Sequence, residues 1–210
     1  SIAGRNFVGG DDVALGGTHA LDTARAFGVP VQASRVDALP RGTVGNLESL
    51  LGRWAPGTAP PPRADATIRY SQALDALGRD RVVSHEVGHL IDKVAGSIKQ
   101  DGLSNELGRL YSELNTQGWV SKWQKGARPQ DFNYAGDDIK RELMAEAIHA
   151  YRTNPNYIKT IAPKTAAAIR AAVNPSPLLN KTIQFNSLAP AAGAGLLGAG
   201  FLADNGGIND

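Results

Sequence analysis

Residues 84–92 read SHEVGHLID, in which two histidines stand four positions apart and a glutamate directly follows the first. In an α-helix this spacing places His85 and His89 on one face, about 6 Å apart along the axis, so both imidazoles can reach one ion. At about 100° per residue, the neighbouring apolar residues gather on the other side of the helix. This stripe comprises Val83, Val87, Leu90, Ile91 and Val94. The histidines, with Asp92 beside them, therefore lie outside the apolar stripe of the helix. Either solvent or another part of the protein must cover their face.

The composition restricts what kind of metal site the chain can form. The 210 residues contain no cysteine, so disulfides and thiolate ligands are excluded, and a metal must be held by His, Asp and Glu. Two of the four histidines belong to this one motif. The near balance of 22 basic and 20 acidic residues favours neither nucleic acid nor an anionic membrane as a partner.

A third ligand is needed, because catalytic zinc is held by three protein groups with one position left for water. The segment RELMAEAIHAY (141–151) offers Glu142 and Glu146, which are spaced to share one helical face with His149. A solvated acidic face is the alternative explanation. The apolar neighbours indicate a packed helix, in which buried carboxylates require a cation or hydrogen-bond partners. A zinc ion bound by Glu142, with Glu146 holding the other N–H of a ligand histidine, satisfies both; Glu146 as the ligand is the main alternative.

The rest of the chain predicts an α+β domain that is mostly helical, with a small β-sheet before the metal helix. VPVQ (29–32) and ATIRYS (66–71) are β-like, and helices are expected at 71–99, within 103–123, at 137–153 and at 162–173. Pro163 is tolerated in the first turn of the last helix. We expect three regions: a Gly/Pro-rich N-terminal region (1–65) packing on or leading into the core, a metallopeptidase core (66–186) and an Ala/Gly-rich tail (187–210). The apolar run of this tail is too short and glycine-broken for a membrane span.

Three segments together resemble a known family. HEVGHLIDKVAG (85–96), ELMAEAIHAY (142–151) and APKT (162–165) are similar to the catalytic domain of anthrax lethal factor and its relatives, which are zinc peptidases of the gluzincin clan. The resemblance covers roughly residues 80–173, about half of the chain, and it implies a zincin-like fold with one catalytic Zn²⁺.

Carried over residue by residue, the resemblance makes His85, His89 and Glu142 the zinc ligands and Glu86 the general base that activates a zinc-bound water. Glu146 becomes the carboxylate that supports a ligand histidine. The family also has a tyrosine that stabilises the oxyanion, and Tyr134 is its match, although its spacing to Glu142 is one residue longer than in the family. Tyr134 could equally be a half-buried loop aromatic.

His149 is the other candidate for the oxyanion donor, although a histidine in that place more often supports a ligand or the structure. Asp92 stands beside the histidines on their helix, and it is also expected to support the metal ligands without binding the metal itself. The segment ATIRYS is expected to form the sheet edge on which an extended peptide pairs by strand addition.

The expected function is that of a zinc-dependent endopeptidase acting on a protein or peptide substrate. The alternatives are a zinc hydrolase of cell-wall or other non-protein amides and a non-catalytic structural zinc domain of an adhesion or virion protein; a structural site has no use for Glu86. Relatives of lethal factor often occur as toxin or effector domains, which implies secretion or delivery within a larger protein, with an inhibitor or immunity protein as a partner. No signal-like segment is visible in the sequence, and we expect the chain to be a piece of a longer protein, so that targeting segments lie outside it.

Overall fold

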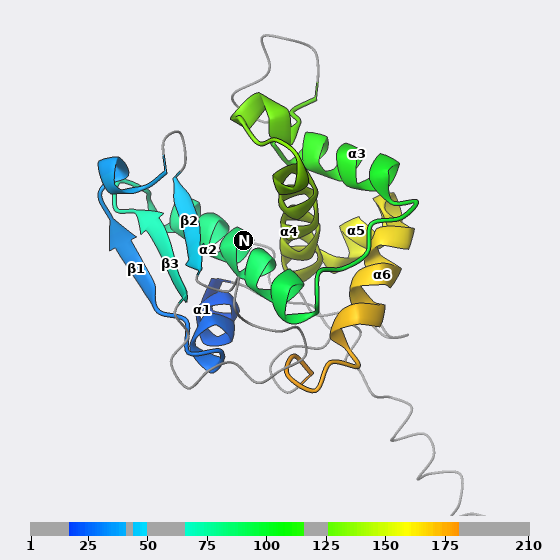
Figure 1. The fold of residues 1–210 in the computed structure, drawn as a ribbon, viewed down its shortest axis with the longest axis horizontal. Helices are drawn as coiled ribbons and strands as arrows, with labels where there is room; N and C mark the ends of the chain where they lie inside the picture. Colours follow the sequence, from blue (N-terminus) through cyan, green and yellow to red (C-terminus); the bar gives the residue numbers. More distant parts are fainter. Residues whose placement is uncertain (1–16, 41–43, 50–65, 116–125, 181–210) are drawn as a thin grey trace, which may run out of the picture.

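The computed structural model describes residues 17–40, 44–49, 66–115 and 126–180. Within these ranges the protein is a mixed α+β structure with six α-helices and one small sheet, as the sequence predicts (Figure 1). The triple proline at 60–62 and the Ala/Gly-rich tail lie outside the described residues. Among the described helices, none has the length and hydropathy that a membrane crossing requires.

The sheet has three strands, β1 (Val31–Ser34), β2 (Gly45–Ser49) and β3 (Ala66–Ser71), in the order β1-β3-β2. β3 pairs parallel with β1 and antiparallel with β2, and Ile68 stands opposite both Val31 and Leu47. The strand predicted at ATIRYS is confirmed, but its expected position at the sheet edge is wrong. Strands from the region before residue 65 flank it on both sides, so β2 is an edge strand of the described sheet.

The histidine motif lies on α2 (Ala76–Val94), which begins and ends inside the predicted range. Asp75 caps its start by accepting the Gly78 N–H at 2.7 Å. Beyond its end, Gly96 (φ 90°) and Ser97 (φ 62°) adopt left-handed conformations, which turn the chain away from the helix axis. The predicted apolar stripe is confirmed, since Val83, Val87, Leu90, Ile91 and Val94 are all buried in the core.

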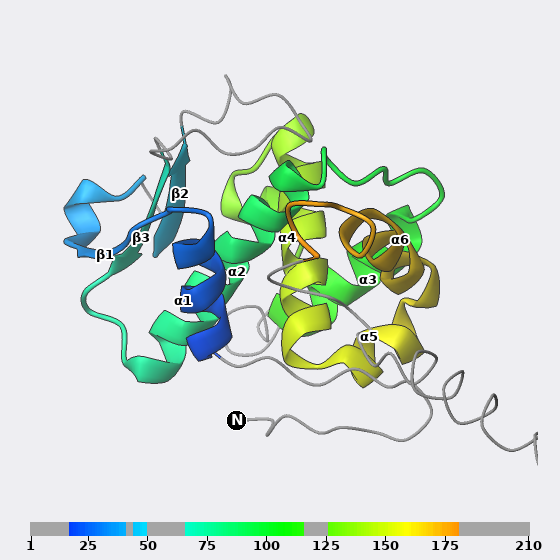
Figure 2. The ribbon, with the colours of Figure 1, turned by 90° about the horizontal axis from the view of Figure 1, so that it is seen from below.

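The helix α2 lies between the sheet on one side and α4 (Asp137–Thr153) on the other (Figures 1 and 2). α1 (Gly17–Ala26) also packs against α2. The α2–α4 contact is close at Gly88, where an added Cβ would collide with the Ala145 carbonyl oxygen. The helix predicted at 137–153 matches α4, and Asp137 and Asp138 occupy its first turn.

Three further helices cover the side of α4 away from the sheet: α3 (Ser104–Asn115), α5 (Pro155–Ile161) and α6 (Pro163–Val173) (Figure 1). Glu106 of α3 accepts the Thr165 N–H at 2.7 Å, which ties α3 to the start of α6. Pro163 stands in the first turn of α6, as the sequence predicts. The sequence did not predict α1 or α5; α5 begins at Pro155, and only Asn154 separates it from the end of α4.

Candidate metal centre

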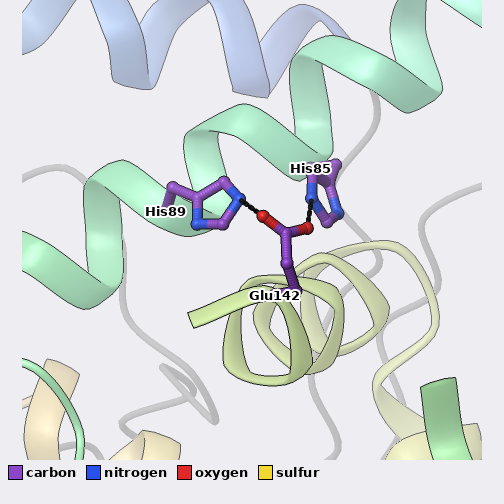
Figure 3. Close-up of side chains that lie close together, drawn as sticks. All are labelled: His85, His89 and Glu142. Carbon is purple, nitrogen blue, oxygen red and sulfur yellow. Dashed lines mark hydrogen bonds and ion pairs between the residues drawn. The ribbon is translucent and has the colours of Figure 1, made fainter. Parts of the chain in front are cut away.

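The two histidines of α2 converge on a single carboxylate of α4. The two Glu142 oxygens lie between the rings, with Oε2 3.2 Å from His85 Nε2 and Oε1 3.2 Å from His89 Nε2 (Figure 3). The rings are arranged edge to face, with centroids 4.9 Å apart. The element that covers the histidine face is therefore α4. Gly88 has no side chain, so α4 can approach closely enough for Glu142 to reach both imidazoles.

Glu146 contacts the opposite side of His85. The His85 Nδ1–H donates to Glu146 Oε2 at 2.7 Å, and Glu146 Oε1 accepts from Arg81 at 3.2 Å. Glu142 thus meets the Nε2 atoms of both histidines, whereas Glu146 meets the other nitrogen of one. This arrangement distinguishes the two carboxylates that the sequence left open, and it favours Glu142 as the third ligand.

The electrostatics of the cluster follow from buried charges of opposite sign. Burial by itself lowers the pKa of His85, but the carboxylates of Glu142 and Glu146 outweigh it and raise the pKa well above 6.5. Burial by itself raises the pKa of Glu142, but hydrogen bonds from His85 and His89 lower it to about 2. The pKa of Glu146 also lies well below its ordinary value, because its histidine neighbours outweigh burial. Both glutamates are therefore anionic at neutral pH.

His149 is buried on α4 behind this cluster. Its Nδ1 lies 3.6 Å from Glu146 Oε2, just outside hydrogen-bond distance, and the atom has no hydrogen-bond partner among the described residues. Burial lowers the pKa of His149, so the ring is neutral at neutral pH. With His85 and Glu146 it forms a second group whose ligand atoms lie within 4.8 Å of one another. Since His85 belongs to both groups, we treat them as one centre.

Glu86 faces the cavities beside the cluster, not the Glu142 contact. Its carboxylate is buried, and burial raises its pKa, although the charges of His85 and His89 and the Leu47 N–H oppose the change. The Leu47 contact comes from β2, which approaches α2 closely at Gly45. A Cβ on Gly45 would collide with Val82 and lie 3.1 Å from Glu86 Oε1. The edge strand is thus held directly against the glutamate of the motif.

Tyr134 precedes α4 and lies beside the same carboxylates. Burial, the charges of Glu142 and Glu86 and a hydrogen bond to Glu142 all raise its pKa. Sequence reasoning missed two neighbours, Tyr111 of α3 and Arg81. Arg81 stands four residues before His85, and that spacing could have placed it on the histidine face. Tyr111 has no comparable signal, because its position depends on how α3 packs.

Asp92 is buried in the last turns of α2, and burial raises its pKa. Its Oδ1 accepts the Ile98 N–H at 2.8 Å, across the turn that contains Ser97. This bond holds the turn that ends the helix.

Two cavities flank the cluster, and Glu86, Tyr134 and Glu142 line both. One has a volume of about 290 Å³ and extends past His89, and the other, of about 190 Å³, extends past His85. The described strand residues Gly45 and Leu47 border the first, and Val44 and Gly45 border the second. An extended chain lying along β2 would therefore pass both cavities with Glu86 between them.

The residues present fit a metal ion. The ligand atoms of His85, His89 and Glu142 all lie within 4.8 Å of one another. Two donors on a tetrahedral zinc ion stand about 3.3 Å apart, because Zn–N and Zn–O bonds are about 2.0–2.2 Å long. The nitrogen–oxygen separations of 3.2 Å on either side of Glu142 match that spacing. The cluster could therefore hold a metal ion, with the donor types that zinc accepts.

No protein-family model matches the chain, and comparisons with curated proteins and with solved structures found no match. The resemblance to the lethal factor family therefore depends on the sequence motifs alone.

Proposed function

We propose that the protein is a zinc-dependent endopeptidase in which His85, His89 and Glu142 bind one catalytic ion. The observation that supports this proposal best is the convergence of both histidine Nε2 atoms on one carboxylate from a different helix. A zinc ion at this place supplies Lewis acidity, which lowers the pKa of a water molecule and polarises a peptide carbonyl. The remaining chemistry belongs to side chains of this chain.

Glu86 acts as the general base. Its carboxylate takes a proton from the attacking water as the water oxygen bonds to the carbonyl carbon. It then passes that proton to the leaving nitrogen as the carbon–nitrogen bond breaks. Burial raises the pKa of Glu86, which strengthens it as a base, while the two histidine charges oppose this effect. The hydrogen bond from Leu47 ties the carboxylate to β2 and so to a peptide bound there.

Tyr134 donates a hydrogen bond to the oxyanion that forms on the carbonyl oxygen. Its raised pKa keeps the phenol protonated at neutral pH, so it can act as a donor. Its place on the wall of both cavities, beside Glu86 and Glu142, supports this role. The substrate pairs with β2, not β3, because β3 has a strand on each side.

The decisive experiment compares Glu86→Ala with wild type after both are loaded with zinc. We expect wild type to cleave an unstructured protein and quenched fluorescent peptides, and the variant to lose roughly 100-fold or more of kcat/KM. Both should retain one equivalent of zinc, measured by atomic absorption. Glu113→Ala serves as the control, because Glu113 lies outside both cavities and pairs with Arg109 at the surface.

Retained turnover in Glu86→Ala would refute the base assignment. A wild-type protein that binds no zinc, or that binds zinc and cleaves no peptide, would refute the peptidase proposal. The origin of the domain in a toxin or effector, with an inhibitor or immunity protein as partner, stays a prediction from the family resemblance.

A further inference from the structure

The larger cavity contains a lysine whose charge is not needed by the metal centre. This cavity, which we call the Lys93 cavity, extends past His89 and is bordered by Lys93 of α2 and by Asp138 and Arg141 of α4. Leu47 of β2 also lines this cavity. Lys93 stands one helical turn after His89, so its side chain leaves the same face of α2 as the ligand histidines.

The other charges of the Lys93 cavity are already engaged. Arg141 forms an ion pair with Asp138. The charge of Lys93 lowers the pKa of Asp92, but burial raises it overall. Oδ1 of Asp92 already accepts the Ile98 N–H. Lys93 is half-buried, and its charge acts on the Asp92 carboxylate, but within the described ranges it forms no hydrogen bond or ion pair. A partly desolvated ammonium group that is not held in an ion pair favours an anionic occupant.

The only lysine or arginine that lines the second cavity among the described residues, Arg81, already pairs with Glu146, so the preference for an anion belongs to one side only. Val44 and Phe132, two large apolar side chains that are 49% and 41% exposed, both line it. The Phe132 ring packs edge to face on Tyr111 at a centroid distance of 6.4 Å. Arg81, which also lines the second cavity, forms an ion pair with Glu146. A peptide crossing the centre therefore meets the side chains of Val44 and Phe132 on one side and Lys93 on the other.

We propose that Lys93 determines specificity by binding a carboxylate of the substrate in the Lys93 cavity, so that cleavage favours an acidic residue close to the scissile bond. This proposal rests on the peptidase function proposed above. The helical turn between His89 and Lys93 rises about 6 Å, and an extended chain advances about 3.3 Å per residue. The acidic side chain is therefore expected within one to three residues of the cleaved bond. Lys93 also stabilises the end of α2 through the helix dipole, but that effect does not discriminate between substrates.

The test uses the full zinc-loaded chain and quenched fluorescent peptides that carry Glu, Gln or Lys in turn at each of the three positions on either side of the cleaved bond. Each peptide is prepared with a free and with an amidated C terminus. We expect wild type to prefer Glu over Gln about tenfold in kcat/KM at one position, as a partly exposed charged hydrogen bond would give. Lys93→Gln should remove this preference, and Lys93→Glu should shift it toward the lysine peptide. Lys99→Gln, at an exposed lysine outside both cavities, should leave it unchanged.

Binding provides a readout that needs no turnover. In the zinc-loaded Glu86→Ala background, fluorescence anisotropy should show the Glu peptide binding about tenfold more tightly than the Gln peptide. Adding Lys93→Gln should abolish the difference.

The outcomes separate this inference from the peptidase function. Cleavage with equal kcat/KM for Glu and Gln at every position overturns the role of Lys93 and leaves the peptidase function intact. An acid preference confined to peptides with a free C terminus overturns the side-chain assignment in favour of the chain terminus. A preference that persists in Lys93→Gln also overturns the proposal. Failure of wild type to cleave any peptide overturns both proposals.

Discussion

At His85 both ring nitrogens contact a carboxylate, and the two contacts have different roles. Glu142 lies where the Nε2 atoms of both histidines converge. Glu146 holds the remaining nitrogen of His85 at 2.7 Å, while Arg81 binds the other oxygen of Glu146. Glu146 therefore orients the His85 ring and favours one tautomer of it. The sequence predicted both carboxylates and their spacing, but the choice between them depends on the directions of side chains that only packing determines.

Replacing Glu146 tests this orienting role. Glu146→Gln should weaken zinc binding by roughly 10-fold or more, because the charge behind His85 is lost. Competition with a chromophoric chelator measures the affinity directly. Glu113→Gln is the matched control, since that glutamate is bonded only to surface partners, Arg109 and Tyr157. Equal affinities for Glu146→Gln and wild type would contradict the assignment.

The low pKa of Glu142 predicts how the metal-free domain responds to acid. Its folded pKa of about 2 lies below the ordinary value of 4.5, so its stabilisation is present above pH 4.5 and is lost as the pH falls toward 2. The raised pKa of His85 has the opposite sign: its stabilisation is present below pH 6.5 and is lost as the pH rises through the folded pKa. Both shifts include the contact between His85 and Glu142, whose stabilisation is therefore strongest between pH 4.5 and 6.5.

Thermal unfolding of EDTA-treated protein across this pH range checks the expectation. The melting temperature of wild type should fall more steeply than that of Glu142→Gln as the pH decreases below 4.5. Identical acid profiles would show that Glu142 makes no charged interaction with the histidines in the metal-free fold.

At the scale of elements, the distance between α2 and α4 determines whether the cluster forms. Gly88→Ala should destabilise the domain by about 1–3 kcal/mol, because the added methyl group meets the Ala145 carbonyl and the helices must separate. The zinc affinity of Gly88→Ala should also fall, because Glu142 moves away from the histidines. Urea unfolding and zinc titration measure the two effects.

Gly108→Ala on α3 is the matched control. Apart from its chain neighbours and its own helix backbone, no atom of the described residues lies within 4 Å of the added Cβ, and alanine is the better helix former. This variant should gain about 0.5–1 kcal/mol in stability with unchanged zinc affinity. A Gly88→Ala protein as stable as wild type would show that the close approach is not required.

The helices were predictable where the periodic pattern is long. The segment 137–153 matches α4 at both ends, and α2 differs from its prediction only at the ends, where the Asp75 cap and the left-handed residues after Val94 act. The strand at 66–71 was predicted from its residues, but its place in the centre of the sheet was not. Sheet order depends on which strands pair, and the sequence of one strand does not contain that information.

At the scale of the whole molecule, Arg152 joins three helices from a fully buried position. The guanidinium of this α4 residue donates to Ser84 Oγ of α2 at 3.1 Å and lies 3.1 Å from His19 Nδ1 of α1. Within the described part of the chain it forms no ion pair with a carboxylate, and burial lowers its pKa to about 10. Ser84 directly precedes His85, so this contact connects the packing of α1 to the start of the histidine motif.

Two substitutions separate the packing of Arg152 from its charge. Arg152→Ala should cost roughly 3 kcal/mol, because it leaves a cavity and removes buried hydrogen bonds. Arg152→Met should cost less than half as much, since its chain fills much of the space and buries no charge. Denaturant unfolding of both variants gives the comparison; equal losses would mean that the hydrogen bonds, and not the filled volume, stabilise this junction.

The sequence by itself determined which side chains share the candidate metal-binding face. Spacing on α2 places His85 and His89 opposite the apolar stripe, spacing on α4 aligns Glu142 with Glu146, and the absence of cysteine limits the ligands to nitrogen and oxygen. Helical periodicity is a local property, so these features follow from one segment at a time. The tertiary structure decided which carboxylate faces both imidazoles, which strand borders the cavities, and how Lys93 and Tyr111 come to lie beside the centre. These features depend on contacts between segments far apart in the chain. Such contacts form only when the whole core is packed, so no single segment predicts them.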